Sequence, residues 1–299
     1  MSKVNKTNYV SEASEFAHHG ELIQGVFEGP DSKLYRGLIT LKFSAFSSTA
    51  IFIKEKGMKD IIVFPKNKIK ALKAAKLSLK HLGKEKEFGG YLIMRSDIPE
   101  GFGFGSSTSD VVTTIKAVSS SFNKIFSQEE IAEIAVSAET ASDAIMFKEC
   151  VLFAQRDGKV LKNYNVSLPP FYIIGFNDSK GETIDTLTFE PAKYNLDEIH
   201  TFKILERLFE HAIKNQDQAL IGQIATVSSK INQKYLPKPH FKEILEIAKK
   251  VKALGVQVAH SGTVVGLIFS NDINKHEKYI EVQQYLKEIG IYKTWEFKF

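Results

Sequence analysis

A glycine-rich run in the first half of the chain is the clearest candidate for chemistry. It extends from Ile98 to Ser109 and reads Ile-Pro-Glu-Gly-Phe-Gly-Phe-Gly-Ser-Ser-Thr-Ser, between a predicted strand and a predicted helix. Glycine permits close backbone approaches that a Cβ atom would block, and amide groups at a helix N-terminus bind anions such as nucleotide phosphates. The run predicts a phosphate-binding loop over 101–107. The alternative is a mobile glycine loop with Ser and Thr as helix caps.

The spacing within this run excludes two common nucleotide motifs. It has no Gly-Lys-Ser/Thr ending, so it is not a P-loop. The dinucleotide-binding fingerprint would need its third glycine one position later. Ser106 and Ser107 add hydroxyl groups at the predicted helix start, where one of them could bind Mg²⁺.

Two carboxylates lie four residues apart at the end of a predicted helix. Glu139 and Asp143 are separated by Thr-Ala-Ser. Such a pair can supply a Mg²⁺ ligand and a base or orienting group for a hydroxyl. The alternative is that both carboxylates face water, as carboxylates at helix ends usually do.

Two histidine-containing stretches complete the candidates. His260-Ser261-Gly262-Thr263 interrupts an apolar strand–turn–strand pattern, which indicates a sharp turn or a close approach. A lone histidine in a turn is more often hydrogen-bonded than catalytic. His18 and His19 precede the stretch 20–25, which reads Gly-Glu-Leu-Ile-Gln-Gly. Neighbouring side chains point apart in a strand or a helix, which disfavours a metal site, so we interpret this stretch as a substrate-binding loop.

The surrounding pattern predicts the elements that must position these residues. Strands grouped with strands and helices grouped with helices favour an α+β fold. Strands are expected at 35–53 (two strands divided at Ser47-Ser48), 60–64, 91–96, 151–154, 160–161, 171–176, 256–259, 263–269 and 292–299. Helices are expected at 66–82, 105–122, 128–138, 197–214, 217–231, 241–253 and 275–289. Ser127 with Glu130 predicts a capping box. The stretch 167–170 is the expected boundary between domains 1–167 and 168–299.

Length and composition exclude several classes of protein. The chain has 299 residues, is 43% hydrophobic and contains one cysteine, Cys150, which excludes a disulfide framework and a cysteine-based zinc site. The formal charge of +5 is concentrated in a lysine-rich stretch at 54–86. We interpret this stretch as a solvated helix face, since no stacking aromatics interleave with its lysines. No apolar run approaches the ~18–20 residues of a membrane span. We therefore expect a cytoplasmic protein that binds neither nucleic acid nor membrane.

Taken together, these motifs resemble the GHMP kinase superfamily, which includes homoserine, mevalonate and galactose kinases. The Pro-x-Gly-x-Gly-x-Gly-Ser-Ser run at 99–107 resembles its nucleotide loop, and the turn after Ala259 resembles its C-terminal motif. The resemblance implies a two-lobed α+β fold with ATP in the cleft between the lobes. The implied nucleotide-binding residues are Pro99, Gly101, Gly103, Gly105, Ser106, Ser107 and Thr108.

Within that superfamily the chain is most similar to the L-threonine kinase branch. Four stretches carry the likeness: 20–25, 183–186 with Phe189, 231–239, and 258–263. The resemblance implies a kinase that phosphorylates a free hydroxy amino acid, with L-threonine as the first choice of acceptor. The implied substrate-binding residues are His18, His19, Glu21, Gln24, Asp185, Thr186, His260, Ser261, Gly262 and Thr263.

The resemblance also implies the catalytic roles. Ser107 and Glu139 would hold Mg²⁺, and Asp143 would orient or deprotonate the acceptor hydroxyl. Two departures bear on the acceptor. His18-His19 stand where the branch has a small residue or cysteine, and the spacing between Glu139 and Asp143 is one residue longer and lacks proline.

Other functions remain open at this point. One alternative is a kinase for homoserine or another small amino alcohol. Another is a catalytically silent protein of the same fold that binds nucleotide. The oligomeric state is also open, and a homodimer is one alternative.

Overall fold

The computed structural model describes residues 9–179 and 193–298. The strands are β1 (Val10–Glu28), β2 (Leu34–Lys56), β3 (Ile61–Phe64), β4 (Phe88–Ser96), β5 (Val151–Ala154), β6 (Lys159–Asn163), β7 (Phe171–Asn177), β8 (Gly255–Val258), β9 (Val264–Ser270) and β10 (Thr294–Lys298). The helices are α1 (Ile69–His81), α2 (Ser106–Ser121), α3 (Gln128–Glu139), the 3₁₀ turn η1 (Ala144–Met146), α4 (Leu196–Lys214), α5 (Gln218–Asn232), α6 (Phe241–Lys250) and α7 (Lys275–Glu288).

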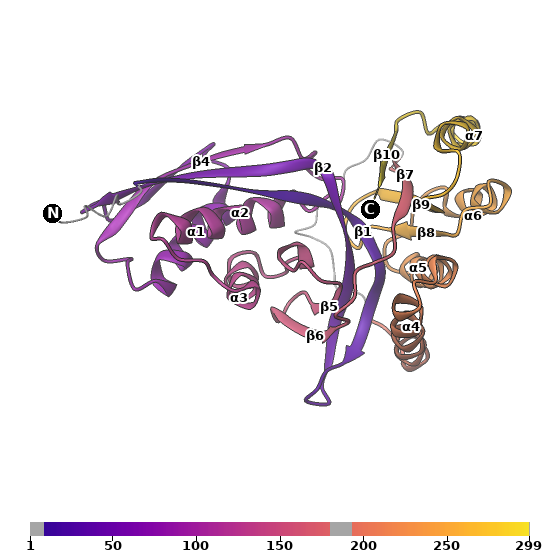
Figure 1. Cartoon of the computed structure of the whole chain (residues 1–299), viewed down its shortest axis with the longest axis horizontal. Helices are drawn as coiled ribbons and strands as arrows, with labels where there is room; N and C mark the ends of the chain where they lie inside the picture. Colours follow the sequence, from indigo (N-terminus) through magenta and orange to yellow (C-terminus); the bar gives the residue numbers. More distant parts are fainter. Residues whose placement is uncertain (1–8, 180–192, 299) are drawn as a thin grey trace.

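The strands form one curved sheet with the helices gathered in two groups (Figure 1). The strand order is β10-β7-β9-β8-β1-β2-β4-β3, and β5 pairs with β2 and β6 beside this path. Helices α1–α3 lie under the long strands of the N-terminal half, whereas α4–α7 lie around β7–β10. The arrangement is the expected two-lobed α+β fold.

Strand β1 is the element that joins the two lobes. It pairs along most of its length with β2 and meets β8 at Glu21 and Val258. Its first residues alternate between exposed and half-buried, but residues 17–25 are all buried because protein covers both faces there. The candidate residues in this stretch are therefore held in a strand between the lobes.

Two predictions about this region were wrong. The stretch 18–25 is part of a long strand, not a loop, because its apolar neighbours are buried on both faces and so do not alternate. The stretch 35–53 lies within one continuous strand, β2, not two. Ser47 remains paired with β1, through Phe16. The pairing of β1 with β2 is irregular at the next residue, because the register shifts between Phe16 and Ala17, whose partners are Ser47 and Phe43. A β-bulge bends a strand without ending it.

Most helices begin and end within a few residues of the prediction. The capping box is confirmed, since the Ser127 hydroxyl accepts from Glu130 N–H and the Glu130 carboxylate accepts from Ser127 N–H. The lysine-rich stretch is only partly a solvated face. Lys54 is buried against the carbonyl of Ser121. Lys68 Nζ lies 2.6 Å from Glu100 Oε1 and also contacts Asp110.

One hydrophobic core is shared by the two lobes. Leu22 of β1 and Leu41 of β2 belong to the same buried cluster as Phe202 of α4, Ile221 of α5 and Ala259 beyond β8. The predicted division of the chain at 167/168 stays a prediction. Among the described residues, no helix combines the length and apolar character needed to cross a membrane.

Candidate active site

The glycine-rich loop and the start of α2 line a cleft between the lobes. Gly105 adopts a left-handed conformation (φ 69°) and immediately precedes the helix. The cleft has a volume of about 480 Å³ and is lined by the loop, by the end of α3 and by residues of β1, β2 and α5. Because the first amides of a helix lack partners within it, this wall presents donors and a partial positive charge to the cleft.

The loop rests directly on the turn that follows β8. Thr263 N–H donates to Phe102 O over 2.8 Å. Gly103 has a φ of 97°, and a Cβ atom there would lie 2.2 Å from the carbonyl oxygen of Ser261. Gly103 is therefore required for both its backbone conformation and its packing. Gly262 and Thr263 contact the loop but do not line the cleft. His260 and Ser261 line the cleft.

Glu139 closes the cleft beside the start of α2. Ser107 Oγ donates to Glu139 Oε2 over 2.6 Å, and Thr108 Oγ1 donates to Oε1 over 2.8 Å. Burial raises the pKa of Glu139 to about 7, and the charge of Asp143 adds to the shift, although the two hydroxyl donors oppose it. Glu139 is therefore poised to lose its proton when a cation arrives.

The Ser107 and Glu139 pair fits a magnesium ion. Both offer oxygen ligands, which Mg²⁺ prefers, and both line the cleft where phosphates would meet the helix N-terminus. A buried carboxylate with a raised pKa gains from a cation beside it.

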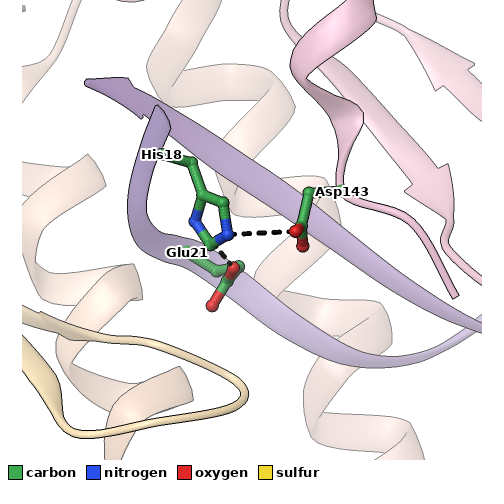
Figure 2. Close-up of side chains that lie close together, drawn as sticks. All are labelled: His18, Glu21 and Asp143. Atoms are coloured by element: carbon green, nitrogen blue, oxygen red, sulfur yellow. Dashed lines mark ion pairs between the residues drawn. The ribbon is translucent and has the colours of Figure 1, made fainter. Parts of the chain in front are cut away.

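Asp143 stands at the centre of a buried network (Figure 2). Its Oδ2 lies 3.0 Å from His18 Nε2 and 3.1 Å from Thr108 Oγ1, whose single proton is shared between this oxygen and Glu139 Oε1. Its Oδ1 has no hydrogen-bond partner within the described part of the chain, and His260 Nδ1 lies 3.7 Å from it. Burial would raise the pKa of Asp143, but the two histidines outweigh it and hold that pKa well below its usual range. Asp143 therefore stays ionised, and its Oδ1 is buried beside His260 without a hydrogen bond in the described residues.

Glu21 holds the His260 backbone and ring in position by hydrogen bonds. Its carboxylate accepts from the backbone N–H of His260 over 2.6 Å and contacts Nδ1 over 3.0 Å. Burial opposes a charge on His260, yet Glu21 and Asp143 raise its pKa to about 9. His18, Glu21 and Asp143 each bring a donor atom within 4.8 Å of one another, as metal ligands do. Gly20 N–H already donates to His18 Nδ1 over 3.1 Å, so we interpret the group as a hydrogen-bonded network.

His19 points away from this network. As successive residues of a strand, His18 and His19 face opposite sides. The His19 ring lies among Phe43, Phe104, Trp295 and Phe297, with ring centroids 4.8–5.9 Å apart. Burial lowers the pKa of His19 to about 3, so the ring is neutral. Its surroundings are those of a core side chain.

The predicted residues divide into those on the cleft wall and those behind it. The wall includes Gly101, Gly103, Gly105, Ser106, Ser107, Thr108, Glu139, Asp143, Gln24, His260 and Ser261. Behind it or beside it lie Pro99, His18, His19, Glu21, Gly262 and Thr263, none of which lines the cleft. Asp185 and Thr186 lie outside the described residues.

Several residues of the wall were not predicted. They are Lys70, Arg36, Arg156, Tyr194, Asn232 and Tyr235. Asn232 Nδ2 donates to Gln24 Oε1 over 2.7 Å, which connects α5 to β1 across the cleft. Isolated arginines on a strand and in a hairpin carry no local signal. They become neighbours only when the sheet brings β2 and β5 together.

We distinguish two groups of residues in the cleft wall. We call the wall formed by Gly101–Thr108, Lys70 and Glu139 the loop end. We call the wall formed by Gln24, Arg36, Arg156 and Asn232 the arginine end. A larger cavity of about 930 Å³ lies between α5, α6 and the end of α7, and none of the predicted residues lines it.

Comparison with known proteins places this geometry in a family. The model of the GHMP kinases N-terminal domain matches residues 67–148, and that of the GHMP kinases C-terminal domain matches residues 209–288. The L-threonine kinase of Citrobacter freundii is 28% identical over 187 residues, which cover 62% of this chain and 63% of that protein. The L-threonine kinase of Salmonella typhimurium is 27% identical over 184 residues, which cover 62% of this chain and 60% of that protein. Each match thus spans less than two thirds of the relative.

Solved structures show the same fold at lower identity. The homoserine kinase of Cytophaga hutchinsonii superposes with a TM-score of 0.73 at 15% identity, covering 100% of this chain and 96% of that chain. At this identity the likeness concerns the fold alone.

Proposed function

The chain belongs to the GHMP kinase family, and we propose that it transfers a phosphoryl group from ATP to the hydroxyl of a free hydroxy amino acid. L-threonine is the first choice of acceptor. The observation that carries the proposal is the shared cleft. The glycine loop, the N-terminus of α2, Glu139 and Asp143 all line it. A phosphate donor and a hydroxyl acceptor placed there would meet beside Asp143.

In this proposal the loop end holds the nucleotide. The amides of 101–107 and the N-terminus of α2 bind the phosphates, and Ser107 and Glu139 hold Mg²⁺. The bound ion supplies neutralisation of the charge on the phosphates. Gly103 and Gly105 have positive φ values and pack where a Cβ atom would meet Ser261 and His18, so they let the loop keep the shape that presents its amides.

Asp143 orients the acceptor. Its carboxylate, which belongs to the cleft wall, accepts the hydrogen bond of the acceptor hydroxyl and aims the hydroxyl oxygen at the phosphoryl group. Because His18 and His260 lower its pKa, Asp143 is a weak base before transfer and is better suited to positioning. In the loose transition state of phosphoryl transfer, positioning and charge stabilisation account for most of the catalysis.

The choice of L-threonine is supported by the two threonine kinases that this chain resembles over 62% of its length. The test is ADP formation, with detection of the phosphorylated product, on L-threonine, L-serine, L-homoserine and 1-amino-2-propanol. We expect O-phospho-L-threonine as the best product, and an Asp143→Asn variant should lose about 10²-fold in kcat, because the acceptor hydroxyl is then less well positioned. If only a larger hydroxylated amino acid gives product, the kinase proposal stands and the choice of L-threonine as acceptor is wrong. No product from any acceptor, with intact nucleotide binding, would favour the silent alternative.

A further inference from the structure

A buried lysine lies outside the cleft, in the connection between α5 and α6. Lys238 belongs to the stretch 231–239 that resembles the L-threonine kinase branch, and its side chain is buried without lining the cleft. Its Nζ donates to Gly262 O over 3.0 Å and lies 3.5 Å from Leu236 O. Because a buried ammonium is costly unless it is hydrogen-bonded, these carbonyl groups show what the side chain holds.

The backbone around Lys238 is restrained, so the ammonium starts from a fixed position. Pro237 and Pro239 flank the residue, and a proline restricts both its own φ and the conformation of the residue before it. Lys238 N–H donates to Gln233 Oε1 over 2.7 Å, which ties the connection to the end of α5. The Gly262 carbonyl is therefore held from a defined point of the C-terminal lobe.

Gly262 transmits its position to the glycine loop because the two backbones touch. Gly262 has a φ of 104°, and a Cβ atom there would lie 2.5 Å from Gly103 Cα and 2.3 Å from Phe102 O. Thr263 N–H and Val264 N–H both donate to Phe102 O, over 2.8 and 3.1 Å. The contact leaves no room for a flexible side chain that could absorb a shift. A displacement of Gly262 therefore displaces the loop.

Two carboxylates lie close enough to act on the charge of Lys238. Glu21 accepts from His260 N–H over 2.6 Å, and Asp178 accepts from His240 N–H over 2.9 Å. Both carboxylates favour the charged lysine, although burial outweighs them and lowers the pKa of Lys238 to about 8. The protein thus keeps this cation beside the turn 260–263 at a cost in solvation.

We infer that Lys238 is a positioning residue for the nucleotide loop: its ammonium holds the Gly262 carbonyl and, through it, the backbone of 101–107. The inference rests on the proposed binding of ATP phosphates by this loop. Amides that are already fixed lose less freedom when the phosphates bind, so holding the loop raises nucleotide affinity. Lys238 then contributes to nucleotide binding without touching the nucleotide.

The first experiment measures binding of a non-hydrolysable ATP analogue with Mg²⁺ to Lys238→Met, which keeps most of the side-chain volume and removes the donors. The Kd should rise about tenfold, as for the loss of one hydrogen bond from a charged group. KM for L-threonine should stay within about twofold. Lys242→Met, at an exposed position in the first turn of α6 outside the cleft, is the matched control and should change neither. A role in stability alone would lower Tm and leave Kd unchanged, and that result overturns the inference.

A double variant tests the route through the turn. Gly103→Ala also disturbs the contact between the loop and the turn, so the effects of the two changes should not add. Lys238→Met combined with Gly103→Ala should bind the analogue at most about twofold more weakly than Gly103→Ala alone. Additive losses, about a hundredfold together, would mean that Lys238 acts by another route and would overturn the inference.

A third measurement needs neither nucleotide nor acceptor. Hydrogen exchange at the amides of Thr263 and Val264, which donate to Phe102 O, should be about tenfold faster in Lys238→Met than in Lys242→Met. If the unaltered protein binds no nucleotide, the proposed function fails, and exchange still decides whether Lys238 holds the turn: equal rates overturn the inference. If Lys238→Met does not fold, Lys238→Gln replaces it with the same expectations, because its shorter side chain does not reach Gly262 O.

Discussion

The two ends of the cleft are built in different ways. The loop end comes mainly from one continuous stretch, 101–108, completed by Glu139 and Lys70. The arginine end comes from single residues of four elements far apart in the chain: β1, β2, the turn after β5, and α5. One end is a local motif, and the other exists only after the sheet has formed.

This difference suits the two kinds of ligand that the proposed kinase would bind. Phosphates are the same in every nucleotide-dependent kinase and are bound well by backbone amides, which any glycine-rich turn can present. Acceptors differ in shape and charge, and side chains on separate strands can change one at a time without disturbing the fold. We therefore expect changes at the loop end to alter turnover and nucleotide binding, and changes at the arginine end to alter the choice of acceptor.

The largest effect is expected from Glu139→Gln. The change removes the anionic ligand but keeps the shape of the side chain, so kcat should fall by about 10²–10³-fold, as when a key charge-stabilising group is lost. KM for the acceptor should change little, because the change removes a metal ligand and leaves the rest of the cleft wall in place. Glu133→Gln, an exposed position on the same helix, is the control for α3 and should be neutral. Near-normal turnover of Glu139→Gln would place the metal elsewhere, with Asp143 as the next candidate ligand.

A pH titration tests the same carboxylate without a mutation. Because the pKa of Glu139 is raised to about 7, the group is protonated below that pH and must lose its proton to bind a cation. The apparent Mg²⁺ affinity of the nucleotide complex should therefore fall about tenfold per pH unit below 7 and level off above it. Titration of Mg²⁺ between pH 5.5 and 8.5 measures this. A profile that is the same in Glu139→Gln would assign the titration to another group.

Much of the loop end could be predicted from the sequence, and little of the arginine end. The glycine run, the helix after it and the Ser107–Glu139 pair are visible because each depends on near neighbours or on a resemblance carried by a motif. The histidines show where such reasoning stops. Strand alternation separates His18 from His19, but only the fold decides which of them faces Asp143 and which enters the aromatic core. Arg36 and Arg156 are 120 positions apart, and strand pairing alone brings them together.

The loop end also depends on a contact with a segment far away in the sequence, and the Gly103→Ala variant tests this dependence. A Cβ atom at Gly103 would lie 2.2 Å from Ser261 O, so the loop must shift away from the turn on which it rests. We expect about a tenfold loss of nucleotide affinity, or ~1.4 kcal/mol, by equilibrium binding. Gly83→Ala is the matched control, since Gly83 also has a positive φ but would meet nothing within 4 Å. Equal nucleotide affinities in the two variants would show that the contact with 261–263 is unimportant for the loop.

The smallest effect is expected at Lys70, in the first turn of α1 at the outer part of the loop end. It is half-buried and lines the cleft, and its positive charge acts on Glu139. Lys70→Met keeps most of the side-chain volume and removes the charge, so KM for ATP should rise by roughly three- to tenfold through lost attraction of the phosphates. Lys73→Met, one turn further along α1 and exposed, is the control and should stay within twofold. Because a partly exposed charge is screened by salt, the difference between Lys70→Met and the unaltered protein should shrink between 0.05 and 0.5 M salt (about 14 to 4 Å of Debye length). An effect independent of salt would mean that Lys70 acts by packing and not by charge, and a change in KM for the acceptor of similar size would break the division of the cleft into two ends.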